Sequence, residues 1–163
     1  SSDLGGVLAF LADYYKGKKL VASIVEPHVA ACIYQSAIID DGRPHSVEGA
    51  PVTIMAGLNC GTPCKITWPI LRDYASFYIS CSDRIAAKGM RSYAAGLNGD
   101  PKVVSGESGA STLGAAEEIL TNDALSDVRS AMGLTSKSIL FLINTEGNTD
   151  PENYKKIISG KAI

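Results

Sequence analysis

Three short apolar runs recur along the chain, separated by segments in which apolar residues have helical spacing. The runs are residues 20–25, 77–81 and 138–143. β-branched and aromatic residues are frequent in them, and polar, Gly or Pro residues bound them, which is typical of buried strands. Strands that alternate with helices usually pair in parallel through helical crossovers. The sequence therefore predicts a layered α/β fold with a largely parallel sheet.

The apolar spacing also predicts where the helices lie. We expect helices at 4–15, 29–39, 66–74, 83–95, 110–120 and 151–158, with a further short helix within 52–58. Pro69 fits the first turn of its helix, and Ser82 is a candidate N-cap. The polar segment 121–137 is predicted to be a connection.

Length and composition limit the class of protein. A chain of 163 residues with 45% hydrophobic content can bury one full core, so residues 1–163 are expected to form a single domain. The net charge is −2 and the basic residues are scattered, which argues against a nucleic-acid partner. No apolar run approaches the ~20 residues of a membrane span, and no leader is visible, so we expect a cytoplasmic protein.

The four cysteines do not indicate a disulfide framework or a metal site. They are Cys32, Cys60, Cys64 and Cys81. Two thiolates at 60 and 64 do not fill a tetrahedral zinc site, and neither His28 nor His45 lies at finger spacing. We expect reduced cysteines and no bound metal.

Polar turns follow the predicted strands, where open α/β sheets usually bind ligands. Residues 105–109 read Ser-Gly-Glu-Ser-Gly, in which Glu107 and Ser108 can form hydrogen bonds, although the start of an ordinary helix explains the pattern as well. Gly5 and Gly6 could end a phosphate-binding loop or allow close packing against the sheet. Walker-type and Gly-x-Gly-x-x-Gly motifs are absent, so nucleotide binding is not expected, and neither histidine lies in a hydrolase motif.

Several motifs in fixed order resemble the C-terminal half of the diaminopropionate ammonia-lyases. They are Glu26-Pro27 with Tyr34-Gln35-Ser36, Thr53 to Leu58, Trp68 to Arg72, Gly89-Met90-Arg91, Gly99-Asp100-Pro101, Ser105 to Ala110, and Thr145 to Pro151. The chain also resembles, more faintly, other fold-type II pyridoxal-phosphate (PLP) enzymes. A helix begins almost at the first residue, so we further expect the chain to be a fragment.

The resemblance implies the C-terminal portion of a three-layer, tryptophan synthase β-like fold in a PLP-dependent lyase. The expected reaction is α,β-elimination of 2,3-diaminopropionate to pyruvate and ammonia by a homodimeric parent enzyme with a small amino-acid substrate. Thr145 matches the hydroxyl residue that faces the pyridine nitrogen, Glu107 matches a glutamate near the cofactor ring, and Gly5 and Gly6 match the end of the phosphate loop.

The same resemblance limits what this chain is expected to do alone. In the family the Schiff-base lysine and the acid/base residues lie in the N-terminal half, so no catalytic residue is assigned here and the segment should be inactive. Cys32 stands where metal-binding relatives have an acidic residue, so no metal site is predicted at Glu26. Two alternatives stay open: a threonine or serine dehydratase, and a non-catalytic half-domain used for binding or assembly.

Overall fold

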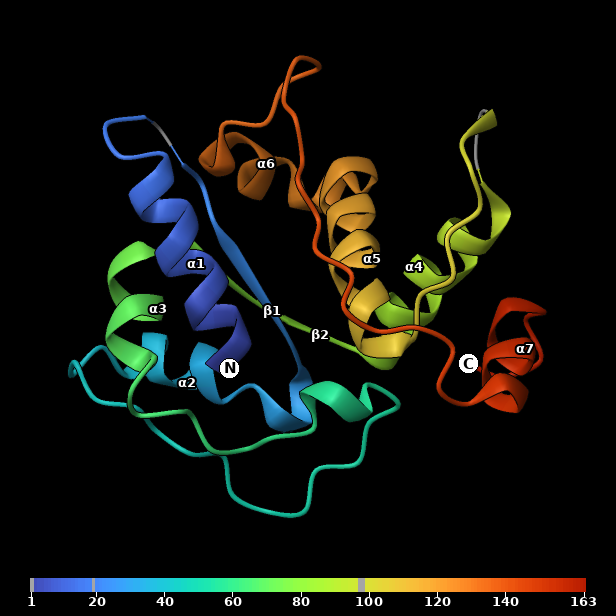
Figure 1. The fold of residues 1–163 in the computed structure, drawn as a ribbon, viewed down its shortest axis with the longest axis horizontal. Coiled ribbons are helices and arrows are strands. Elements are labelled where there is room, and N and C mark those ends of the chain that lie inside the picture. Colours follow the sequence, from blue (N-terminus) through green and yellow to red (C-terminus); the bar gives the residue numbers. More distant parts are fainter. Residues whose placement is uncertain (1, 19, 97–98) are drawn as a thin grey trace. The chain divides into compact units, whose positions relative to one another are not determined.

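The computed structural model describes residues 2–18, 20–96 and 99–163 (Figure 1). The chain forms two compact units. Unit 1 consists of Ser1–Val52 and Asn59–Ser80, and unit 2 consists of Thr53–Leu58 and Cys81–Ile163. Each unit is described by itself, and the single domain expected for residues 1–163 stays a prediction.

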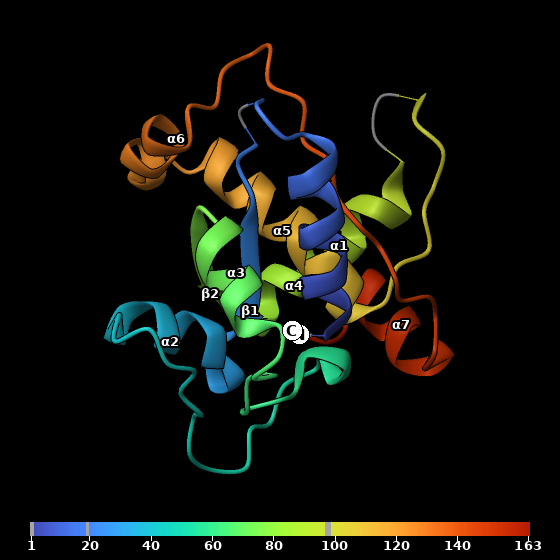
Figure 2. The ribbon, with the colours of Figure 1, turned by 60° about the vertical axis from the view of Figure 1, so that its left-hand side comes forward.

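Unit 1 combines three helices with a small parallel sheet. Its elements are α1 (Ser2–Tyr14), β1 (Ser23–Pro27), the 3-10 helix η1 (His28–Ala30), α2 (Cys32–Ile39), α3 (Trp68–Tyr74) and β2 (Phe77–Cys81), of which the last residue belongs to unit 2. The strands β1 and β2 are neighbours, and α1 packs against α3 in both ribbon views (Figure 1, Figure 2). The buried core cluster is Leu8, Ile24, Cys32, Ile33, Trp68 and Leu71.

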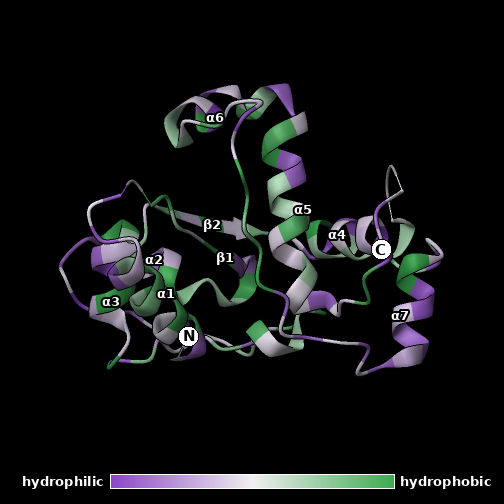
Figure 3. Ribbon diagram, turned by 45° about the horizontal axis from the view of Figure 1, so that its top comes forward, coloured by the Kyte–Doolittle hydropathy of each residue, from purple (hydrophilic) through white to green (hydrophobic). Residues whose placement is uncertain are grey.

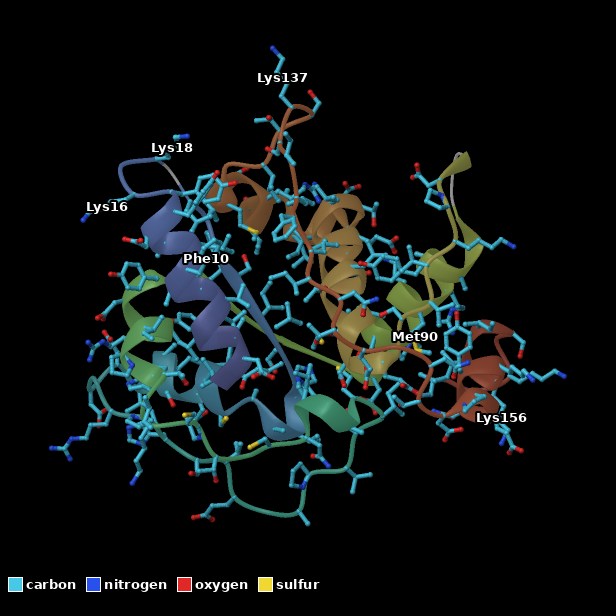
Figure 4. The ribbon with its side chains drawn as sticks, in the orientation of Figure 1. Phe10, Lys16, Lys18, Met90, Lys137 and Lys156 are labelled. Carbon is cyan, nitrogen blue, oxygen red and sulfur yellow. The ribbon has the colours of Figure 1, made fainter. Side chains whose placement is uncertain are left out.

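Unit 2 is built around two helices whose backbones touch. Its elements are the 3-10 helix η2 (Ala56–Leu58), α4 (Asp83–Ala95), α5 (Glu107–Thr121), the 3-10 helix η4 (Asp123–Leu125), α6 (Ser126–Met132) and α7 (Pro151–Ile158). A Cβ atom placed on Gly114 of α5 would lie 1.9 Å from the carbonyl oxygen of Ile85 on α4. Only a residue without a side chain permits this approach. Met90 is fully buried and packs with Ala87, Ala110 and Ile157, which brings α7 against α4 (Figure 4).

Most of the expected elements are confirmed. The bounds expected for β2, α4 and α7 match those of the structure, Pro69 lies in the first turn of α3, and β1 begins three residues later than expected. The capping role of Ser82 is wrong, because its side chain makes no capping hydrogen bond. The segment 121–137 is not only a connection, since it forms η4 and α6. The α/β class with a parallel sheet is confirmed.

The strand expected at residues 138–143 is wrong. The segment is an extended trace without strand pairing, and the exposed fractions of Ile139 and Phe141 are 95% and 74%. Figure 3 shows it as a hydrophobic stretch of the trace that follows α6. A strand is stabilised by backbone hydrogen bonds to a neighbour, and the sheet of the described chain contains only β1 and β2. The apolar pattern is therefore present without its pairing partner.

None of the helices in the described residues is both long enough and apolar enough to cross a bilayer.

Candidate functional site

The start of α5 presents backbone N–H groups that need acceptors from elsewhere in the chain. The helix begins at Glu107, and Gly106 at the N-cap position has no side chain to accept a hydrogen bond. The first turn of a helix leaves such groups without an intrahelical partner. We call residues Ser105–Gly109 the α5 start, and residues Asn144–Glu146 the 144–146 turn. Both lie in unit 2.

Glu146 of the 144–146 turn supplies those acceptors. Its Oε2 accepts from the backbone N–H of Ser108 at 2.5 Å and of Gly109 at 3.0 Å. Its backbone carbonyl also accepts from the N–H of Gly106 at 3.1 Å. A carboxylate is favourable at this place because the amide dipoles of the helix give its N-terminus a partial positive charge. Glu146 therefore caps α5 from a distant part of the chain.

Asn144 anchors the other side of the same turn. Its Oδ1 accepts from the hydroxyl of Ser105 at 3.0 Å and from the backbone N–H of Glu146 at 3.2 Å. Ser105 is completely buried. A Cβ atom on Gly109 would lie 2.2 Å from Asn144 Oδ1, so the amide group occupies the space that a side chain at 109 would need. The turn and the helix start are fitted to each other.

Thr145 lies between these two anchoring residues and is itself exposed. No residue in the part of the chain that the structure describes forms a hydrogen bond with its hydroxyl. The hydroxyl is therefore available to a group from outside this chain, while the backbone on both sides of it is held. The sequence predicted Thr145 as a cofactor-binding residue, and this role stays a prediction.

Glu107 is nine-tenths buried, and its carboxylate is directed to α7. Its Oε1 accepts from Asn153 Nδ2 at 2.6 Å. This contact joins the first residue of α5 to the first turn of α7, where the Asp150 side chain accepts from the N–H of Asn153. Glu107 thus has a structural contact of its own within unit 2, and its expected place near a cofactor ring stays a prediction.

Gly5 and Gly6 lie within α1 of unit 1 and differ in their surroundings. A Cβ atom on Gly5 would lie 2.5 Å from the Cβ atom of Thr67, so Gly5 allows α1 to pack closely on the segment before α3. Gly6 is exposed and has no heavy atom within 4 Å of the Cβ position. The structure supplies a packing reason for Gly5 and none for Gly6. Their expected role at a phosphate stays a prediction.

Glu26, at the carboxyl end of β1, holds the start of α2. Its carboxylate accepts from the backbone N–H groups of Ile33 at 3.0 Å and Tyr34 at 2.8 Å. Burial nevertheless raises the pKa of Glu26 above its ordinary value. The Cys32 thiol lies 3.6 Å from the same carboxylate, and burial together with the Glu26 charge raises the pKa of Cys32 to about 12. No cluster of three metal-ligating side chains occurs in the described residues.

The four cysteines differ in exposure and acidity, which predicts their order of alkylation. Cys32 and Cys81 are buried, and burial raises the pKa of the Cys81 thiol to about 11. Hydrogen bonds from Thr67 lower the pKa of Cys64, and Cys60 is exposed. At pH ~8 only thiols near or below their ordinary pKa contain appreciable thiolate, the reactive form. Iodoacetamide should therefore label Cys60 and Cys64 first, as followed by peptide mass spectrometry.

Alkylation after unfolding in urea provides the control for this prediction. All four cysteines should then react at similar rates, because burial no longer affects two of them. Equal labelling of Cys32 and Cys64 in the folded chain would contradict the positions of these thiols.

The lysines noted in the sequence occupy surface positions. Lys65 is exposed, and Lys88 forms an ion pair with Glu118 at 2.8 Å. Lys137 is exposed, and its side chain points outward from the loop that follows α6 (Figure 4). These environments are those of ordinary surface charges.

The functional importance of Asn144 and Glu146 was missed by sequence reasoning. Both residues were quoted as part of a turn, with no task assigned to them. Their contacts join residues 37 to 39 positions apart, which no local pattern reports. The usable signal was the pair of glycines at 106 and 109, since glycines at a helix start can mark the approach of another segment.

Residues Thr53–Leu58 belong to unit 2 because two contacts tie them to it. The Asp83 carboxylate accepts from the Thr53 hydroxyl and from the N–H of Ile54. The N–H of Gly57 donates to the Ser108 hydroxyl at 3.0 Å. A segment distant in sequence thus reaches the α5 start.

Comparison with known proteins places these features in a wider group. No protein-family model matches the chain. The curated diaminopropionate ammonia-lyase of Salmonella typhimurium is 44% identical over 155 residues, which are 94% of this chain and 38% of that protein. The Escherichia coli enzyme in complex with D-serine has a TM-score of 0.86 at 36% identity and covers 98% of this chain and 39% of its own. Another structure of that enzyme holds an aminoacrylate–PLP azomethine reaction intermediate, with a TM-score of 0.87.

A more distant structure defines the fold class. Maize serine racemase has a TM-score of 0.72 at 22% identity, over 97% of this chain and 43% of its own. The fold is therefore a portion of the tryptophan synthase β-like fold of fold-type II PLP enzymes. The chain is a homologue of diaminopropionate ammonia-lyase. It spans about two fifths of the length of the relatives that it matches.

Proposed function

We propose that this chain supplies the ring-facing turn of a PLP-dependent ammonia-lyase that converts 2,3-diaminopropionate to pyruvate and ammonia. The homology to enzymes of this name supports the proposal. The whole protein is proposed to act as a homodimer on this small amino acid, as the resemblance implies. The observation that carries the proposal is Thr145, an exposed hydroxyl on a turn that is held on both sides.

The residues of this turn fit the nitrogen side of a PLP ring. The Thr145 hydroxyl can form a hydrogen bond with a ring nitrogen without placing a charge beside it. The neighbouring carboxylate of Glu146 is engaged by the amides of the α5 start. A neutral partner leaves the nitrogen unprotonated in a dry site, because an unpaired cation there is costly.

The chemical consequence concerns how the α-carbon loses its negative charge. When bound, PLP withdraws electrons from the substrate α-carbon, so that the β-amino group can leave. Because Thr145 does not hold the ring nitrogen protonated, the ring is a weaker electron store, and expulsion of the β-group is favoured over retention of the charge. Gly5 and Gly6 are proposed to face the phosphate, and Glu107 the ring edge.

We further propose that this chain alone is inactive. The three lysines that sequence reasoning weighed for attaching the cofactor are an ion-paired Lys88 and the exposed Lys65 and Lys137. An attached lysine is normally activated by burial or by a neighbouring cation, and none of these three is buried. The attaching lysine is therefore proposed to come from outside these 163 residues.

The test compares this chain with the complete reading frame that encodes it. The complete protein should show the visible absorbance of lysine-bound PLP and release pyruvate from 2,3-diaminopropionate, and this chain should do neither. Absence of the absorbance from the complete protein would refute the proposal.

Assays with serine and threonine distinguish the related chemistry. A bacterial threonine deaminase, from T.th., is 27% identical with a TM-score of 0.57 over 74% of this chain, which makes a dehydratase the second candidate. Faster formation of the 2-oxo acid from serine or threonine than from diaminopropionate would assign the protein to that reaction. A complete protein that binds no PLP and has no turnover would instead favour a binding or assembly role.

A further inference from the structure

We propose that Asn144 and Glu146 are positioning residues for Thr145, and that their hydrogen bonds to the α5 start give its hydroxyl one fixed place. The inference rests on the proposed function, in which that hydroxyl meets the ring nitrogen. Neither residue needs to touch the cofactor or the substrate. They act through the backbone on either side of Thr145.

The first support is that Thr145 is held only through its neighbours. Its own side chain is exposed, and the described chain offers it no hydrogen bond. Asn144 is held by Ser105, which is completely buried, and Glu146 is held by three backbone N–H groups of the α5 start. Fixing the backbone on both sides removes conformations in which the hydroxyl points elsewhere.

The second support is that the α5 start leaves room for both anchoring groups. A Cβ atom on Gly109 would lie 2.2 Å from Asn144 Oδ1, and one on Gly106 would lie 2.7 Å from the carboxyl carbon of Glu146. The two places without a side chain are those that the two anchoring side chains fill. Contacts of this closeness indicate a preorganised turn, which is the usual support of a functional group.

The third support concerns charge. Glu146 is the chain neighbour of Thr145, and a mobile carboxylate at this place could compete for the ring nitrogen and hold it protonated. Two N–H groups at 2.5 and 3.0 Å engage Glu146 Oε2, and the Ser108 hydroxyl donates to Oε1 at 3.3 Å. The same contacts that position Thr145 thus engage the nearest negative charge.

The first experiment measures the anchoring in this chain without any cofactor. Amide hydrogen exchange is compared for the natural chain, Glu146→Ala, Glu146→Gln and the control Asn148→Ala, an exposed residue of the same loop. Glu146→Ala should speed exchange at Ser108 and Gly109 by about 10- to 100-fold, the loss expected for hydrogen bonds to a charged group. Glu146→Gln keeps one acceptor oxygen and should restore part of the protection. Unchanged exchange in Glu146→Ala overturns the inference.

The second experiment uses the complete reading frame loaded with PLP. Thr145→Ala, Glu146→Ala and the double variant form a double-mutant cycle. If Glu146 acts through Thr145, Glu146→Ala should lower kcat about 10-fold and shift the cofactor absorbance as Thr145→Ala does, and the double variant should lose no more than Thr145→Ala alone. Independent, multiplicative losses overturn the positioning role, and so does a loss confined to thermal stability.

The two experiments separate this inference from the proposed function. A complete protein that binds no PLP overturns the proposed function, and with it the catalytic purpose of the anchored turn, even when the exchange result holds. PLP binding and turnover combined with unchanged exchange overturn only the inference. If Glu146→Ala does not fold, Glu146→Gln takes its place in the cycle, with the same expected non-additivity.

Discussion

Replacing Thr145 by aspartate in the complete protein should slow elimination from 2,3-diaminopropionate by about 100-fold or more, within the range that loss of one preorganised contact costs an enzyme. A carboxylate beside the ring nitrogen would keep it protonated, because the opposite charge stabilises the protonated form. The ring would then retain electrons that otherwise expel the β-amino group. Exchange of the substrate α-proton with solvent should therefore increase relative to pyruvate release. Both rates are measured on one sample by proton NMR in deuterated buffer.

Thr145→Ser is the matched control for this change. Serine keeps the hydroxyl and loses only a methyl group, so elimination should stay within a few-fold of the natural rate. The cofactor content of each variant, measured by absorbance, separates slower chemistry from loss of PLP. Natural elimination rates in Thr145→Asp at full cofactor content would exclude a contact between residue 145 and the ring nitrogen.

The largest effect on stability is expected at Gly114. A Cβ atom there would lie 1.9 Å from the carbonyl oxygen of Ile85, so Gly114→Ala must force α4 and α5 apart. Overpacking of this kind costs about 1–3 kcal/mol, and the obstacle here is backbone rather than a flexible side chain. We expect the free energy of unfolding to fall by about 3 kcal/mol, less the ~1 kcal/mol that alanine gains as a better helix former. Urea unfolding followed by circular dichroism measures the difference.

Gly6→Ala is the control for this substitution. Gly6 also lies in a helix, but no heavy atom lies within 4 Å of its Cβ position. The exchange should therefore stabilise the chain by about 0.5–1 kcal/mol. A Gly114→Ala chain as stable as the natural one would show that α4 and α5 do not approach this closely.

Local signals were enough to predict most helices. Pro151 at the first helical position and Asp150 before it mark the start of α7, and the Asp150 side chain does accept from the N–H of Asn153. β2 combines aromatic and β-branched residues between two breaks in the pattern. These preferences operate within a few residues, so the sequence displays them directly.

Elements that depend on distant partners could not be predicted in the same way. Residues 138–143 have a strand's composition, but a strand also needs a paired neighbour. α6 was missed because it is short, has no buried residue and lacks a clear apolar face. At the start of α4, Asp83 accepts from Thr53 and Ile54, some 30 residues away, and no pattern around Ser82 reveals this.

The motifs behind the family resemblance prove to have different purposes. Trp68 and Arg72 both donate to the carbonyl of Gly42, and Arg91 donates to the carbonyl of Ile157, so these residues hold the fold together. Thr145 instead lies in an anchored turn, and no described residue forms a hydrogen bond with its hydroxyl. Resemblance alone ranked the motifs equally, and the contacts distinguish the structural motifs from the candidate functional one.

The exposed run at residues 139–143 affects how this chain behaves at high concentration. Five consecutive apolar residues without charge or proline, held extended and unpaired, can form backbone hydrogen bonds with the same run in another molecule. Self-association through this segment should increase with protein concentration and compete with folding. Lys137 and Asn144 at its two ends are the polar residues that oppose such stacking. The chain on its own is thus expected to require dilute handling.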